Sequence, residues 1–335
     1  MRMRRAVCAL IMIMFNVQHL YSSEKREVEI NKPVNFTLVS NAYCISSMLQ
    51  ALIALPTWRS YIMNYPPKGC SLAICDTDIL NALRRLVTLY SQSAEQDVSL
   101  NTTWLHRLLM QKKDPYSPMR IDELSPEGFL YELDDRLFLR NSTVDLFSPC
   151  SLREIFYYRV REISGEYVHD QLQLTLANVN GYSMKQAIQQ YLGDQTVTFL
   201  DDGSTTQYRN KLVSLPRVLW IRLTLGGGRS PKILQQIYGS DLMEGGEGFI
   251  YQLVSFVGSN GSDSIAYVKY DNKWYCCNNL LNEPCPIVND ISTVFTMKNG
   301  DDWNLFYERV QQEPLPVERA SILPDLHASL TLLGI

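Results

Sequence analysis

Two reactive side chains, Tyr43 and Cys44, lie next to each other at the expected start of a helix. Ser40 or Asn41 can cap this helix, and apolar residues recur at helical spacing over 48–55. A thiol at a helix N-terminus is stabilised as a thiolate by the helix dipole and the unpaired backbone N–H groups. Cys44 is therefore a candidate nucleophile. The alternative is that Cys44 is a packed core side chain.

The order of residues around this pair resembles a known motif. Residues 41–52 read Asn-Ala-Tyr-Cys-Ile-Ser-Ser-Met-Leu-Gln-Ala-Leu. This stretch resembles the cysteine box of the ubiquitin-specific proteases, a papain-like deubiquitinase family, which reads Asn-Thr-Cys-Tyr-Met-Asn-Ser-x-Leu-Gln-x-Leu. The residues that match without a gap are Asn41, Ser47, Leu49, Gln50 and Leu52. In this register the nucleophile position falls on Tyr43, because the family's Cys-Tyr is reversed to Tyr-Cys.

Segments near the C-terminus carry the other specific part of the resemblance. Residues 264–270, 274–277 and 304–309 follow one another like the family's Gly-His-Tyr-x-Ala-Tyr-Val, Trp-Tyr-x-Phe-Asp-Asp and Leu-Phe-Tyr-x-Arg pieces. An alignment without gaps places the histidine position on Asp263 and the position that orients this histidine on Asn278.

The resemblance implies which parts of the catalytic site are kept. The family's reaction needs a thiolate, a histidine base, a side chain that orients the base, and an oxyanion donor. Asn41 matches the oxyanion donor and Asn278 the orienting residue, whereas Tyr43 and Asp263 replace the nucleophile and the base. A carboxylate is a poor acceptor for a thiol proton at neutral pH, and its charge opposes a nearby thiolate. We therefore expect impaired catalysis.

Cys44 remains the alternative nucleophile. It lies one residue after the family's position, roughly 100° further round a helix, so its thiol would point elsewhere unless the helix start shifts. The sequence has four histidines, and none stands on a sheet strand expected beside the helix start. They are His19, His106, His169 and His327.

Hydrophobic periodicity divides the chain into a helical half and a sheet half. Helices are expected over 76–90, 105–110, 125–133 and 183–192. Strands are expected over 154–163, 171–177, 215–223, 249–257, 264–270, 274–277 and 303–309. We expect the helix within 38–55 to pack against the sheet made by the last five strands, with 304–309 closing that sheet.

The sequence predicts an α+β fold, and the resemblance implies the papain-like arrangement of thumb, fingers and palm. The expected domain is 23–310, with a C-terminal tail over 311–335. Its parts are a helical thumb over 38–143, shortened fingers over 144–180 and an antiparallel palm over 181–310.

The N-terminus predicts targeting. A basic segment, 1–5, is followed by 12 mostly apolar residues over 6–17, which is typical of a secretory signal peptide ending near residue 22. A signal anchor, or a buried first helix of a cytoplasmic protein, is the alternative. We expect no membrane contact in the mature form. The net charge of −4, with no basic cluster beyond the N-terminus, argues against nucleic acid as a partner.

The eight cysteines show no metal-binding pattern. They lack any Cys-x-x-Cys pair, so we expect no bound zinc, no other metal and no cofactor. Their irregular spacing does not describe a disulfide framework, although one bridge is compatible with it. Cys276 and Cys277 are expected to alternate between the two faces of a strand, with metal binding or a bridge as the alternative.

These features favour a ubiquitin-specific-protease-like protein that has lost its catalytic pair and binds ubiquitin, a ubiquitin-like protein or another partner. The alternatives are an active thiol deubiquitinase that uses Cys44, and a secreted interaction protein without enzymatic activity.

Overall fold

The structure is a computed structural model, and it describes segments between residues 28 and 311. The described residues are 28–37, 43–64, 77–111, 125–137, 153–156, 158–162, 168–171, 173–176, 183–198, 205–224, 232–259, 264–278, 284–296 and 302–311. The predicted N-terminal signal segment lies outside them, and so does the predicted C-terminal tail beyond its first residue, Gln311.

Helices dominate the first part of the described chain and strands the second. The helices are α2 (Tyr43–Ala54), α3 (Pro56–Asn64), α4 (Thr77–Gln96), α5 (Thr103–Gln111), α6 (Pro126–Leu137), α7 (Arg153–Phe156) and α8 (Met184–Tyr191), with 3-10 turns η3 (Gly239–Asp241) and η4 (Ile291–Thr296). The strands are β1 (Phe36–Thr37), β2 (Leu100–Asn101), β3 (Tyr158–Glu162), β4 (Val168–Gln171), β5 (Leu174–Leu176), β6 (Asp194–Thr198), β7 (Thr205–Ser214), β8 (Val218–Thr224), β9 (Gln236–Tyr238), β10 (Phe249–Ser259), β11 (Ser264–Tyr270), β12 (Lys273–Cys277), β13 (Ile287–Val288) and β14 (Asp302–Gln311). The fold is therefore mixed α+β, as the sequence predicted.

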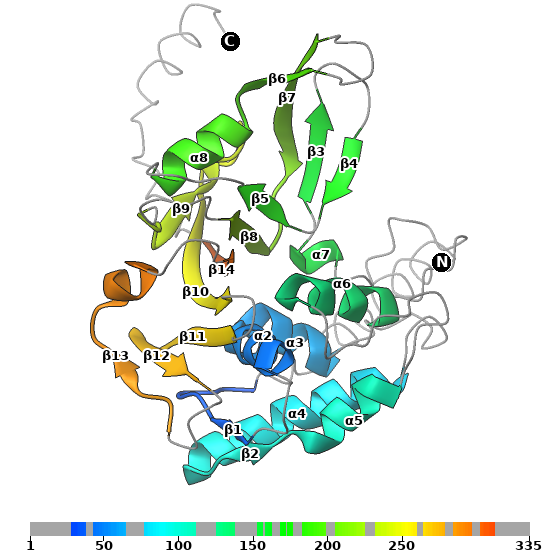
Figure 1. Cartoon of the computed structure of the whole chain (residues 1–335), viewed down its shortest axis with the longest axis vertical. Coiled ribbons are helices and arrows are strands. Elements are labelled where there is room, and N and C mark those ends of the chain that lie inside the picture. Colours follow the sequence, from blue (N-terminus) through cyan, green and yellow to red (C-terminus); the bar gives the residue numbers. More distant parts are fainter. Residues whose placement is uncertain are drawn as a thin grey trace, which may run out of the picture.

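The main sheet has eight strands in the order β13-β12-β11-β10-β14-β8-β5, with β9 paired to β10. Its pairs are antiparallel except for β5 with β8, which are parallel. A second sheet has the order β4-β3-β7-β6 and lies at the top of Figure 1, away from α4 and α5. It combines β3 and β4 with β6 and β7, so its strands come from both sides of residue 180, where we expected the fingers to end and the palm to begin.

The main sheet is covered on both faces, because its strands put alternate side chains on opposite sides. Val257, Ala266 and Val268 belong to the core that contains α2 and the other helices of the first half. Phe256 and Tyr267 belong to a second core on the other face, which includes α8. Figure 1 shows α2 in the middle of the molecule, with the strands beside it and α4 and α5 below.

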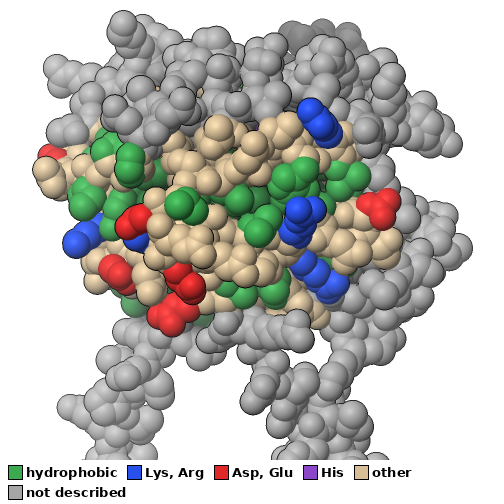
Figure 2. Space-filling view, turned by 90° about the horizontal axis from the view of Figure 1, so that it is seen from below, with side chains coloured by type: hydrophobic (Ala, Val, Ile, Leu, Met, Phe, Trp, Pro, Cys, Tyr) green, Lys and Arg blue, Asp and Glu red, His purple; other side chains and the backbone are tan. Residues whose placement is uncertain are grey.

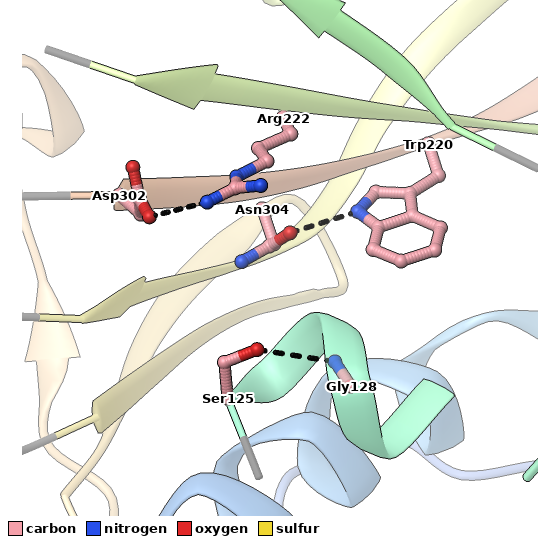
Figure 3. Close-up of polar contacts among 6 residues, drawn as sticks. All are labelled: Ser125, Gly128, Trp220, Arg222, Asp302 and Asn304. Carbon is pink, nitrogen blue, oxygen red and sulfur yellow. Dashed lines mark hydrogen bonds and ion pairs between the residues drawn. The ribbon is translucent and has the colours of Figure 1, made fainter. Parts of the chain in front are cut away.

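Paired side chains hold the centre of the sheet together. Figure 3 shows Trp220 and Arg222 on β8 reaching toward β14. The Trp220 indole donates to Asn304 at 3.0 Å, and Arg222 forms an ion pair with Asp302 at 2.7 Å. Phe306, the middle residue of the Leu-Phe-Tyr stretch, stacks on Trp220 with ring centroids 5.9 Å apart. The apolar and polar contacts together fix β14 against β8.

Local sequence signals explain several element ends. Ser183 makes a capping box with Gln186 at the start of α8. The Ser125 hydroxyl accepts the Gly128 N–H at 3.1 Å at the start of α6, which Figure 3 also shows. Asp271 and Asn272 take positive φ angles, 47° and 61°, in the turn that joins β11 to β12. These residue types tolerate that conformation, so they allow a tight hairpin between the two strands.

Two strand predictions were wrong in detail. The segment 154–163 begins as the short helix α7 and becomes a strand only at β3. In α7, Ile155 and Phe156 are buried, and Phe156 packs edge-on against Phe306. A short apolar run cannot be assigned to strand or helix by periodicity alone. The segment 171–177 contains the end of β4 and all of β5, which belong to different sheets.

The predicted role of 304–309 was also wrong. These residues lie in β14, but β14 does not close the sheet at an edge; it pairs with β10 on one side and β8 on the other. Leu305 and Tyr307 point to one core and Phe306 to the other, and all three are buried, as a central strand requires.

The outer surface carries both signs of charge. Seen from below, apolar side chains lie among separate acidic and basic ones (Figure 2). Lys32 and Asp97 form an exposed ion pair at 2.6 Å, a kind of contact that contributes little to stability. Within the described ranges, no helix is long and apolar enough to cross a membrane.

Candidate active site

The N-terminus of α2 meets the start of β11. The Cys44 sulfur lies 3.2 Å from the Ser264 hydroxyl oxygen, and the Ser47 hydroxyl donates to the Ser264 carbonyl at 2.6 Å. Ser47 is one of the residues that match the cysteine box, and Ser264 directly follows the position that matches the family's histidine. The contact thus joins the two segments that were predicted to carry nucleophile and base.

The end of β12 lies beside the start of β11. Ala266 on β11 is opposite Cys277 on β12, so the antiparallel pair brings the start of β11 and the end of β12 together. Asn278, the predicted orienting residue, comes directly after Cys277 and is half-buried. The two ends of the β11–β12 hairpin therefore lie together, and one of them contacts the first turn of α2, which is more than 200 residues earlier in the sequence.

The structure describes some of the predicted site residues and not others. Tyr43 is the first residue of α2, and Cys44 follows it as a half-buried side chain. Asn41 and Asp263 lie outside the described residues, and so does the side chain of Tyr43.

The described contacts of Cys44 include no general base. Its hydrogen-bond partner among the described residues is the hydroxyl of Ser264. A serine hydroxyl is far less basic than an imidazole and does not take up a thiol proton at neutral pH. The described contacts of Cys44 therefore resemble those of a structural thiol more than those of a nucleophile.

His106 lies closer to α2 than its sequence position suggested. It is buried on α5, and its Nε2 atom lies 3.4 Å from the hydroxyl oxygen of Ser46 on α2. Residues two apart on a helix point about 200° away from each other, so Ser46 and Cys44 face different sides of α2. Burial also lowers the pKa of His106 to about 4, which makes it a weak base. No local sequence signal predicts this contact between helices.

This buried histidine predicts a pH-dependent stability. Its pKa is lowered to about 4 in the folded chain, below the ordinary value of 6.5, so the unfolded chain takes up a proton first as the pH falls. Between about pH 7 and about pH 5, His106 is expected to reduce the free energy of unfolding by roughly 2 kcal/mol. Urea denaturation at both pH values measures the change. His106→Gln cannot titrate and is the control, and an equal pH dependence in this variant would contradict the assignment.

Gln50 of the cysteine box has a structural role. Its side-chain amide donates to the Val34 carbonyl at 2.5 Å, and its side-chain oxygen accepts from the Tyr90 hydroxyl at 2.7 Å. The Tyr90 hydroxyl in turn accepts the Val34 N–H at 3.0 Å. These three buried hydrogen bonds fasten the extended segment before α2 to both α2 and α4. The sequence match identified Gln50 but not these partners.

The described cysteines and carboxylates hold no metal-ligand group. Within the part of the chain that the structure describes, no three His, Cys, Asp or Glu side chains converge to bind a metal ion. Cys277 is buried and Cys276 is half-buried, which agrees with the predicted alternation along a strand.

Comparison with known proteins identifies no family. No protein-family model matches the sequence. A search of curated proteins likewise finds no significant match.

Proposed function

We propose that this protein is a catalytically impaired relative of the ubiquitin-specific proteases that binds ubiquitin or a ubiquitin-like protein. The proposal includes the papain-like arrangement of thumb, fingers and palm. The observation that carries it is the contact of Cys44 and Ser47 with Ser264, because the register implied by the family motifs requires this helix start and this strand start to meet. Asn278 follows β12 at the same end of the β11–β12 hairpin, which further supports the proposal.

The impaired chemistry rests on the residues at the reactive positions. Tyr43 offers a phenol, with an ordinary pKa of about 10, where the family has a thiol. Asp263 offers a carboxylate where the family has an imidazole. The neighbouring thiol of Cys44 has a hydroxyl partner and no described histidine beside it. Binding without hydrolysis is therefore the function that this site supports best.

Ubiquitin binding and ubiquitin labelling together test the proposal. We expect the purified protein to bind ubiquitin in a calorimetric titration, and to bind ubiquitin without its C-terminal Gly-Gly more weakly, since the family threads that tail toward the nucleophile. We also expect no covalent adduct with ubiquitin vinyl sulfone. An adduct that disappears in Cys44→Ala would instead assign an active thiol deubiquitinase.

A failure to bind any ubiquitin-like protein would favour the secreted interaction protein. We also propose that the protein enters the secretory pathway. This part of the proposal rests on the N-terminal sequence alone, because the predicted signal segment lies outside the described residues. N-terminal sequencing of the protein made in eukaryotic cells tests it, and an intact Met1 on a cytoplasmic product would contradict it.

A further inference from the structure

At the outer edge of the main sheet, the pairing of β12 with β13 continues in the same register into the residues that precede β13. β12 and β13 are antiparallel, with Tyr275 opposite Ile287. The N–H of Cys276 donates to the carbonyl of Pro286 at 2.9 Å, which continues the same register by one residue. The two backbones are thus still in contact where β13 itself has ended.

The next pair in this register is Cys277 with Cys285. Because the preceding pair is hydrogen-bonded, this one is a non-hydrogen-bonded pair, and the Cα atoms of such pairs lie about 4.5 Å apart. Disulfides bridge Cα atoms that are about 4.4–6.8 Å apart. The backbone therefore holds these two cysteines at a separation that a disulfide spans.

The two thiols also interact with each other. Cys277 is fully buried and Cys285 is half-buried. Burial raises the pKa of Cys277, and the side-chain hydrogen bond with Cys285 raises it further. Cys276 makes its side-chain hydrogen bond with Tyr267, which belongs to the core on the other face of the sheet. Cys277 therefore pairs with Cys285, and Cys276 is a matched control in the same strand.

We propose that Cys277 and Cys285 are an oxidation site that forms a cross-strand disulfide between β12 and the segment preceding β13. The oxidant is a low-molecular-weight disulfide such as glutathione disulfide. The thiolate of the more accessible Cys285 attacks it, forming a mixed disulfide and releasing one glutathione. The thiolate of Cys277 then attacks the Cys285 sulfur and releases the second glutathione. The two protein thiols lose two electrons and two protons, and the external disulfide gains both.

The bridge lies beside the candidate active site but does not depend on the proposed function. Cys277 is paired with Ala266 on β11 and is followed directly by Asn278. The bridge therefore fastens the short outer strand β13 to the backbone that carries Asn278, and it adds a covalent bond where the strand pairing is shortest.

Peptide mapping of the full-length protein tests the proposal. All three cysteines lie on one tryptic peptide, 274–298. The reduced protein is incubated with glutathione disulfide, unfolded, alkylated without reduction and digested. We expect this peptide to lack two hydrogen atoms and to carry a single alkyl group, which fragmentation places on Cys276. Three alkyl groups, or stable glutathione adducts without a bridge, would overturn the proposal.

A comparison of the Cys277–Cys285 bridge with the Cys276–Cys285 bridge shows whether the folded backbone selects the disulfide. In the folded chain we expect the Cys277–Cys285 bridge to exceed the Cys276–Cys285 bridge by at least about tenfold, because only the first pair has the required geometry. In urea the two should form to similar extents. Cys277→Ser and Cys285→Ser should lose the bridge, whereas Cys276→Ser should keep it. A folded wild-type chain with the same mixture as in urea would also refute the proposal, whatever the variants do.

Discussion

The double variant Tyr43→Cys, Asp263→His is expected to hydrolyse a fluorogenic ubiquitin substrate at least about 100-fold faster than the wild type. A thiol at residue 43 would stand at the first residue of α2, where the helix dipole favours a thiolate. A histidine at 263 would directly precede Ser264, which already contacts the first turn of this helix. Asn278 would orient the new imidazole from the end of β12.

Each single variant is expected to remain near the wild-type rate, because nucleophile and base act as a unit. Adding Asn278→Ala to the double variant should reduce its turnover, while Cys44→Ala should leave it unchanged. The measurement is the rate of fluorophore release by the wild type and these variants. Equal rates in the double variant and the wild type would count against the register on which the proposed function rests. Wild-type turnover that is lost in Cys44→Ala would show that Cys44 is the nucleophile.

Replacing Gln50 by alanine is expected to destabilise the protein by about 3–5 kcal/mol. The change removes two buried hydrogen bonds, takes the side-chain donor from the Val34 carbonyl and the acceptor from the Tyr90 hydroxyl, and opens a cavity beside α2. Tyr90→Phe keeps the ring but removes the hydroxyl, so it should cost less, about 1–3 kcal/mol. Both values are measured as free energies of unfolding in urea.

A double-mutant cycle with these two residues tests the network. The effects of Gln50→Ala and Tyr90→Phe should not add, because both changes break the same hydrogen bond. Gln189→Ala on the exposed side of α8 is the matched control, with an expected change within about 0.5 kcal/mol. Additive effects, or a loss at Gln50 no larger than at Gln189, would contradict the role assigned to Gln50.

The sequence predicted the parts of the fold that local signals specify. The periodicity of the apolar residues predicted the helices that form α2, α4 and α8, and the predicted helix over 183–192 begins at the Ser183 cap. The strand-like segments 264–270 and 274–277 predicted β11 and β12. In each case the residues that determine the element lie within it or next to it, so no knowledge of distant contacts is needed.

The sequence could not predict contacts that depend on register and on distant packing. The pairing of Cys277 opposite Cys285 follows from the hydrogen bond between Cys276 and Pro286, which the spacing of the cysteines does not specify. The contact of His106 with Ser46 depends on how α5 docks against α2. At the candidate site, the order of the motifs predicted that the segments of Cys44 and Ser264 lie close together. It did not predict that the Ser264 hydroxyl is the partner of the Cys44 thiol.

The central place of β14 has a consequence for how the protein is made. β14 is the last described strand along the chain, yet it pairs with β10 and β8, which were synthesised earlier. Until β14 emerges from the ribosome, those two strands have unpaired edges, and Trp220 lacks its contacts with Asn304 and Phe306. A chain that stops before residue 302 would expose such edges and apolar surface to aggregation and to cellular proteases. Completion of the main sheet is therefore delayed until nearly all of the described chain has been translated.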